Sequence, residues 1–264
     1  MTMSEPALSI DHVSVHFGGL AAVADMSFVV NEGELVSLIG PNGAGKTTAF
    51  NVITGFLKPT QGHVRYRGVA LTGLKSHEVA NLGLVRTFQK TSVFGNNTVS
   101  ENVLIGLHRH GKASVWDTLI ALPRVRKEES RLREEAWEIL RFVGLEKRAD
   151  ELGGALPYGE QRLLEVAIAL AARPSLLLLD EPVSGMNPSE TASFIALLEK
   201  IRARDITVLL VEHDMHLVMN VSDRIVVLNY GRIIAEGPAQ AIQENPEVIR
   251  AYLGHGVRRP ARHA

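Results

Sequence analysis

Residues 40–47 read GPNGAGKT, and this stretch limits the fold and chemistry of the chain more than any other. The spacing GxxxxGKT is that of a loop that binds phosphate groups. The loop follows an apolar run over 34–39 and opens a predicted helix over 46–54. Glycines let successive backbone N–H groups converge on one anion, and the N-terminus of the helix adds its own N–H groups and positive dipole. The pattern therefore predicts a strand, a phosphate loop and a helix that bind a nucleoside triphosphate.

Within this phosphate loop, we expect Lys46 to reach the β- and γ-phosphates and the Thr47 hydroxyl to bind Mg²⁺. The alternative is a glycine-rich turn that only begins a helix, which requires four fixed positions to match by accident. Such a match occurs in roughly 1% of chains of this length. The predicted phosphate-binding residues are Gly40, Pro41, Asn42, Gly43, Ala44, Gly45, Lys46, Thr47 and Thr48.

Length and composition narrow the remaining possibilities. A chain of 264 residues can bury a full core, as one large domain or as one domain with an inserted lobe. The formal charge of −1 argues against a broad nucleic-acid-binding face, and the absence of cysteine excludes disulfides and thiolate metal sites. The N-terminus lacks the features of a signal peptide, and the longest apolar run has seven residues, against ~18–20 needed to span a bilayer. We expect any role at a membrane to act through a partner.

The first half of the chain predicts strands followed by helices. Residues 8–39 contain β-like segments, and 63–66 and 84–88 are further predicted strands. From about 90 to 158 the pattern becomes helical. There, Thr98-x-x-Glu101 forms a capping box, and apolar residues recur at helical spacing before Gly144, which is placed to end their helix.

The second half predicts alternating helices and strands. The predicted strands are Leu176–Asp180, Thr207–Glu212 and Arg224–Asn229. Their uninterrupted apolar runs are typical of strands buried on both faces of a largely parallel sheet. Asn187-Pro188 and Asn245-Pro246 each place an asparagine cap before a proline at the first helical position. The expected fold class is therefore α/β.

A second chemical feature is the sequence LLLLDEP at 176–182, an apolar strand that ends in a pair of carboxylates. We expect Asp180 to lie beside the phosphate loop and to hold Mg²⁺ through water. Glu181 would then polarise the attacking water. Many strands end in acidic residues, so this string is weak evidence alone. Its occurrence downstream of a phosphate loop favours a catalytic pair.

Together these motifs resemble the nucleotide-binding subunits of ABC transporters, and the resemblance covers about residues 8–254. It implies that Phe17 stacks on adenine, that Gln89 contacts nucleotide and Mg²⁺ at the junction with the helical lobe, and that His213 meets the γ-phosphate. It also implies a P-loop NTPase core of the RecA-like type, with a mainly parallel sheet, an N-terminal antiparallel β segment and an inserted α-helical subdomain. The expected division is a core of 1–89 and 159–254, an insertion of 90–158 and a basic tail of 255–264.

The signature segment of that family, usually LSGGQ, differs in this chain, where it reads Leu156-Pro157-Tyr158-Gly159-Glu160. In the family this segment caps the γ-phosphate held by the opposite subunit, which implies a head-to-tail dimer with two composite sites. Pro157 supplies neither the serine hydroxyl nor an N–H group. Gly159 and the following helix N-terminus remain able to meet an anion. Two alternatives follow: Pro157 weakens its composite site, or Gly159 and the helix terminus suffice.

These departures resemble one group within the family. The LxYGxQ signature, the GMNP turn at 185–188, the stretch VEHDM and the ending NPEVIRAYLG are similar to ATP-binding proteins of bacterial branched-chain amino acid importers, of the type with the longer insertion. The resemblance implies ATP and Mg²⁺ as cofactors, a second ABC ATPase as partner, expected to be a paralogue, two permeases and, indirectly, a periplasmic or extracellular substrate-binding protein. It places the chain at the cytoplasmic face of the bacterial inner membrane.

Two other functions remain open at this stage. One is a sister transporter for urea, amides or lipopolysaccharide. The other is an ABC ATPase outside transport, acting on ribosomes or DNA. Proteins of that second kind typically carry two cassettes, long coiled coils or cysteine-based zinc modules, and this sequence contains none of these.

Overall fold

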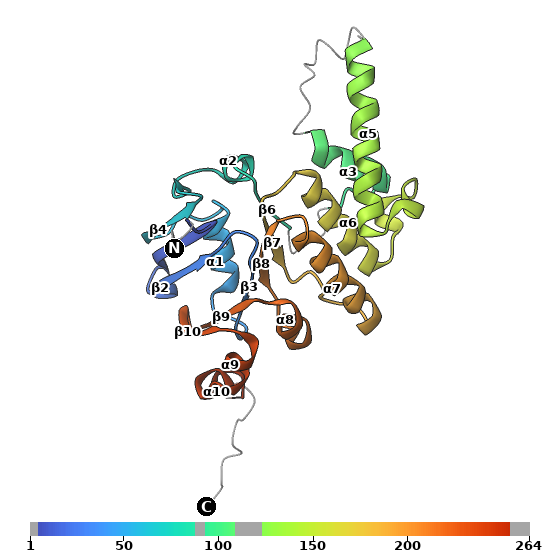
Figure 1. The fold of residues 1–264 in the computed structure, drawn as a ribbon. Helices are drawn as coiled ribbons and strands as arrows, with labels where there is room; N and C mark the ends of the chain where they lie inside the picture. Colours follow the sequence, from blue (N-terminus) through green and yellow to red (C-terminus); the bar gives the residue numbers. More distant parts are fainter. Residues whose placement is uncertain (1–4, 88–92, 109–122, 254–264) are drawn as a thin grey trace, which may run out of the picture.

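The computed structural model describes residues 5–87, 93–108 and 123–253, which form two β-sheets with helices packed around them (Figure 1). Gln89 and the basic tail of 255–264 lie outside the described residues. Within the described ranges, none of the helices combines the length and the apolar character needed to cross a membrane.

The elements alternate along the chain in the manner expected of an α/β fold. The strands are β1 (Leu8–Phe17), β2 (Leu20–Val30), β3 (Leu35–Ile39), β4 (Gln61–Tyr66), β5 (Val69–Ala70), β6 (Leu84–Arg86), β7 (Leu176–Asp180), β8 (Thr207–Val211), β9 (Arg224–Asn229) and β10 (Arg232–Gly237). The helices are α1 (Lys46–Ile53), α2 (Ser76–Asn81), α3 (Val99–His108), α5 (Pro123–Val143), α6 (Tyr158–Ala171), α7 (Pro188–Arg202), α8 (Met215–Val221), α9 (Ala239–Glu244) and α10 (Pro246–Leu253), with short 3₁₀ turns at Glu146–Arg148 and Gly153–Ala155.

The larger sheet has six strands in the order β10-β9-β3-β8-β7-β6. The five strands from β9 to β6 are parallel, and β10 pairs with β9 antiparallel. Every residue of β3, β7 and β8 is buried. Along β7, Leu177 and Leu179 pack on the face that carries α6 and α7, whereas Leu176 and Leu178 pack on the face that carries α1. The predicted strands buried on both faces are confirmed.

The smaller sheet has four strands in the order β2-β1-β4-β5 and is antiparallel. Its inward side chains share one hydrophobic core with α1 and with one face of the larger sheet; Leu8, Val13 and Phe50 are among its fully buried members. This arrangement confirms an N-terminal antiparallel segment. It also encloses the helix that begins at the phosphate loop.

The helices α3, α5 and α6 pack together beside the larger sheet (Figure 1). The capping box at α3 is confirmed, because the Thr98 amide donates to the Glu101 carboxylate at 2.7 Å and the Glu101 amide donates to the Thr98 hydroxyl at 3.2 Å. Where α3 crosses α6, a Cβ atom on Gly106 would lie 2.8 Å from the carbonyl oxygen of Ile168. The helix α6 thus belongs to the same packed helical layer as α3 and α5.

Candidate nucleotide-binding site

The phosphate loop of residues 40–47 connects β3 to α1, and other segments pack tightly against its backbone. Gly40 has a φ of 154°, and a Cβ atom there would lie 2.1 Å from the carbonyl oxygen of Leu228. Gly45 has a φ of 106°, and its Cβ would lie 2.4 Å from the carbonyl oxygen of Ala22. A side chain at either position would meet backbone atoms that cannot move aside cheaply. Glycine is therefore required at both positions for the loop to pack against its neighbours.

A cavity of about 490 Å³ opens at this loop. Lys46 is buried at its base, where its Nζ donates hydrogen bonds to the carbonyl oxygens of Gly40 at 2.7 Å and Pro41 at 3.1 Å. Burial lowers the pKa of Lys46, while Glu181 and Asp180 oppose that shift. The cavity is lined by Leu20, Ala21, Ala22, Asn42, Gly43, Ala44, Gly45, Lys46, Thr47, Thr48, Glu181 and Tyr230.

An aromatic side chain lies on each of two segments beside this cavity. The predicted Phe17 is 53% exposed at the end of β1 and pairs with Leu20, which lines the cavity. Tyr230, in the turn between β9 and β10, lines the cavity itself. The amide of the next residue, Gly231, donates to the carbonyl oxygen of Ala44 at 2.8 Å and so ties the turn to the phosphate loop. Tyr230 was missed by the sequence prediction, because nothing in the sequence near it indicates this long-range contact.

The predicted acidic pair lies where β7 ends. Asp180 is the last residue of β7 and is 2% exposed. Glu181 follows with a φ of 48°, an unusual backbone conformation for a non-glycine residue, and its amide donates to the carbonyl oxygen of Val211 at 2.8 Å. The Nδ1 atom of His213 lies 3.9 Å from Oε1 of Glu181. The structure therefore brings Glu181 and His213 together at one edge of the sheet.

Arg86, at the end of β6, forms a buried ion pair with Asp180. Its Nη2 atom lies 2.6 Å from Oδ2 of Asp180, and the two side chains are 8% and 1% exposed. Its Nη1 atom donates to Oδ1 of Asn51 on α1 at 2.7 Å. The sequence prediction missed this residue, because Arg86 and Asp180 are 94 positions apart. The signal available in the sequence was an arginine at the end of a predicted strand. It would have indicated this ion pair only once that strand was known to lie beside the strand that ends in Asp180.

Glu212 is fully buried directly after β8, and its carboxylate accepts hydrogen bonds from three backbone amides. These come from Val183 at 3.0 Å, His213 at 2.9 Å and Asp214 at 3.3 Å. Burial raises the pKa of Glu212, while the three amides partly offset this shift. The carboxylate thereby connects the segment after Glu181 to the segment that carries His213. The sequence prediction had assigned Glu212 no function.

The signature segment lies at the N-terminus of α6. Pro157 occupies the N-cap position, and Tyr158 begins the helix. The Tyr158 hydroxyl accepts hydrogen bonds from Nη2 of Arg162 at 2.5 Å and from its Nε at 3.1 Å. Its ring lies against Gly185, because a Cβ atom there would be 2.9 Å from Cε1 of the tyrosine. Since α6 and α1 pack on opposite faces of the larger sheet, this segment is separated from the phosphate loop of its own chain.

The phosphate loop between β3 and α1, with the acidic pair on a neighbouring parallel strand, defines a P-loop nucleoside triphosphatase. The sequence matches the ABC transporter family over residues 23–184, and its end matches the branched-chain amino acid ATP-binding cassette transporter family over 232–258. The chain belongs to the ABC transporter family, as an ATP-binding cassette. The resemblance noted from its motifs is confirmed.

Named relatives extend this match over nearly the whole chain. The high-affinity branched-chain amino acid transport ATP-binding protein BraF of Pseudomonas aeruginosa is 46% identical over 253 residues, which are 96% of this chain and 99% of BraF. The corresponding protein LivG of Escherichia coli strain K12 is 44% identical over the same shares of both chains. Both relatives are thus similar to this chain over nearly its whole length.

Solved structures are similar in fold. A crystal structure of the ADP conformation of MJ1267, an ATP-binding cassette of an ABC transporter, has a TM-score of 0.83 and 34% identity, and covers 95% of this chain and all of that one. A dimeric structure of the ATP-binding cassette MJ0796 in a post-hydrolysis state, bound to ADP and Pi, has a TM-score of 0.75 and 25% identity over 88% of this chain and 98% of that one. The predicted P-loop NTPase core is confirmed.

We predict that Glu212→Ala destabilises the protein by about 3 kcal/mol, because three buried N–H groups lose their acceptor. This value allows for water entering the space and accepting some of these hydrogen bonds. The free energy of unfolding is measured by urea denaturation. Glu199→Ala, on an exposed position of α7, is the control and is expected to change stability by less than about 0.5 kcal/mol. If both variants were equally stable, the three bonds would contribute nothing.

Proposed function

We propose that this chain hydrolyses ATP to energise a bacterial ABC importer for branched-chain or hydrophobic amino acids. One observation supports ATP hydrolysis most directly: the phosphate loop and Glu181 line the same cavity, and His213 lies beside Glu181. The substrate class is supported by the printed functions of BraF and LivG and by the C-terminal family match. The alternative is a related transporter for urea, amides or lipopolysaccharide.

The oxygen groups at the cavity suit a hard cation such as Mg²⁺. The Thr47 hydroxyl lines the cavity, and the Asp180 carboxylate lies close enough to affect Lys46 electrostatically. Among the described residues, there is no group of three or more histidine, cysteine or acidic side chains that could hold a metal. Mg²⁺ in nucleotide sites uses one or two protein oxygens with phosphate and water, so these residues fit. Bound Mg²⁺ would neutralise phosphate charge, and Gln89 is proposed to contribute from outside the described residues.

In the proposed reaction, a water molecule attacks the γ-phosphorus in line with the bond to the β–γ bridging oxygen. That bond breaks, and ADP and phosphate leave. Glu181 orients the water, Lys46 and the loop amides hold the phosphates, and His213 contacts the γ-phosphate. Phe17 is proposed to stack on the adenine. Each of these groups lies on the cavity or adjoins a residue that lines it.

The functional unit is proposed to be a head-to-tail dimer. The signature residues Pro157, Tyr158, Gly159 and Glu160 lie at the α6 terminus, across the sheet from α1, so a second cassette is needed to bring such a segment to the nucleotide. The dimeric cassette structure similar to this chain supports the pairing of two cassettes. We infer that the second cassette is a paralogue with a more usual signature.

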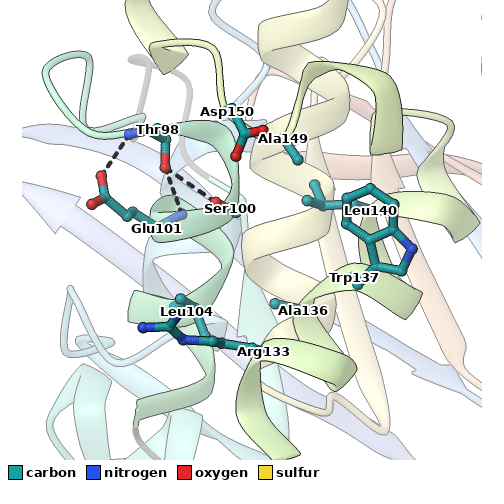
Figure 2. A pocket seen from close by; sticks show the side chains of 10 residues that line it. All are labelled: Thr98, Ser100, Glu101, Leu104, Arg133, Ala136, Trp137, Leu140, Ala149 and Asp150. Atoms are coloured by element: carbon teal, nitrogen blue, oxygen red, sulfur yellow. Dashed lines mark hydrogen bonds between the residues drawn. The ribbon is translucent and has the colours of Figure 1, made fainter. Parts of the chain in front are cut away.

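The inserted lobe, residues 90–158, is proposed to receive a short cytoplasmic helix from one of two permeases. A cavity of about 390 Å³ lies between α3 and α5, and Figure 2 shows side chains of the two helices facing one another across it. Trp137 is 43% exposed there, beside Leu104 and the charged Arg133. An apolar surface with a charged rim suits an amphipathic helix. The chain would then work at the cytoplasmic face of the bacterial inner membrane, while a periplasmic or extracellular protein binds the solute.

The catalytic assignment predicts that Glu181→Gln retains ATP binding but loses hydrolysis by about 10²–10⁴-fold, because a positioned base is removed. Binding is measured by equilibrium dialysis and turnover by phosphate release from the assembled transporter. Lys46→Ala is the contrasting variant and should impair ATP binding itself. Equal turnover in Glu181→Gln and wild type would exclude this role for Glu181.

The coupling assignment predicts that Trp137→Glu in the α3–α5 cavity lowers solute transport at least about tenfold and leaves basal ATP hydrolysis unchanged. The reason is that a charged side chain replaces the apolar ring on which the permease helix would pack. Transport is measured in proteoliposomes with the companion binding protein. Glu134→Arg, an exposed charge reversal on the same helix but outside the cavity, is the control. A proportional loss of basal hydrolysis would argue against coupling through this cavity.

The signature assignment predicts that Pro157→Ser raises ATP hydrolysis by roughly tenfold, because a hydroxyl bond to a charged oxygen is regained. The rate is measured in the assembled transporter with the partner's signature disabled. Pro157→Ala restores the N–H without the hydroxyl and separates the two contributions. No gain, or full-rate transport by this chain paired only with itself, would remove the support for unequal sites.

A further inference from the structure

Arg86 connects three elements that meet at the nucleotide site. It ends β6, its Nη2 pairs with Asp180 on β7 at 2.6 Å, and its Nη1 donates to Asn51 on α1 at 2.7 Å. The guanidinium carbon also lies 5.4 Å from the centre of the Phe50 ring. Both members of the ion pair are almost fully buried, at 8% and 1% exposure. This contact is therefore part of the interior and not a surface pair that salt would screen.

Asp180 is buried, so its ion pair with Arg86 affects the stability of the protein. A carboxylate in the interior needs hydrogen bonds or an opposite charge to offset its lost hydration, and among the described residues Arg86 is the cation bonded to Asp180. The Asp180 amide is held separately, by the Thr87 hydroxyl at 3.3 Å. The backbone of Asp180 is thus positioned by the residue that directly follows Arg86 at the end of β6. Removing the guanidinium would leave the carboxylate in place without its bonded counter-ion, with Lys46 as the nearby charge that acts on it through space.

We propose that Arg86 is a resident counter-ion that competes with Mg²⁺ for Asp180 and thereby sets the Mg²⁺ concentration that nucleotide binding requires. This inference rests on the proposed role of Asp180 at the metal. When one cation is bound to the Asp180 carboxylate, the other gains less free energy from binding to it. The binding of Mg²⁺ and the Arg86 ion pair are therefore thermodynamically linked. Arg86 is a positioning residue in this scheme, since it acts through Asp180. It keeps the protein stable without metal at the cost of a weaker metal site.

The test compares wild type with Arg86→Gln, which removes the charge and keeps an amide able to bond Asn51. ADP binding is followed as Mg²⁺ is titrated, and thermal unfolding is followed without metal or nucleotide. In Arg86→Gln, the half-maximal Mg²⁺ concentration is expected to fall about tenfold, which corresponds to about 1.4 kcal/mol of lost competition. The melting temperature without metal should fall, and saturating Mg²⁺ with ADP should restore most of it.

Three further variants make the result specific. Asp180→Asn should abolish the Mg²⁺ dependence of ADP binding. Combining it with Arg86→Gln should recover the melting temperature, because neither member of the buried pair is then charged. Arg67→Gln, which removes the arginine of the exposed pair with Glu32, is the matched control and should change neither quantity. If Arg86→Gln does not fold, the double variant with Asp180→Asn should still fold.

An unchanged or higher Mg²⁺ requirement in Arg86→Gln would overturn the proposal, as would a double variant no more stable than Arg86→Gln. These outcomes differ from failure of the metal role itself. In that case wild type would bind ADP with equal affinity with and without Mg²⁺, or Asp180→Asn would keep the dependence.

Discussion

Burial of the central strands on both faces is the constraint on which the site depends. Because β3, β7 and β8 are buried throughout and are apolar apart from Ser37 and the end residues Thr207 and Asp180, charged groups stand only where the strands end. These strands are parallel, so their carboxyl ends meet at one edge of the sheet. The phosphate loop follows β3, the acidic pair follows β7, and Glu212 with His213 follows β8. The burial of these strands on both faces therefore places the phosphate loop, the acidic pair, Glu212 and His213 at the same edge of the sheet.

The phosphate loop is also shaped from outside the parallel strands. Its glycines allow the carbonyl oxygens of Ala22, on the antiparallel sheet, and of Leu228, on β9, to approach the loop backbone. The Gly231–Ala44 hydrogen bond adds a third contact from the last hairpin. Segments near both ends of the chain thus hold the loop in position. The antiparallel sheet and the last hairpin are therefore structural supports of the phosphate loop, although the residues proposed for the chemistry follow the parallel strands.

Features that are local in sequence could be predicted, and features that join distant segments could not. The phosphate loop, the acidic pair and the Asn187–Glu190 capping box each lie within a few residues, and their spacing alone predicts their geometry. The strands were found from their apolar runs, with ends differing by one or two residues: β8 ends at Val211, one residue before the predicted end. Arg86 and Tyr230 were missed, because their contacts depend on the order of strands in the sheet.

The three carboxylates at this edge differ in how they are compensated, and this difference separates their roles. Glu212 is fully buried and saturated by backbone amides, so it serves the shape of the loops. Asp180 is buried and shares its charge with a guanidinium, so a second cation can compete for it. Glu181 is 31% exposed on the cavity, beside His213, and has the access to water that its neighbours lack. We propose that burial and the cations and N–H groups around each acid separate these three similar carboxylates into a structural role, a metal-binding role and a water-orienting role.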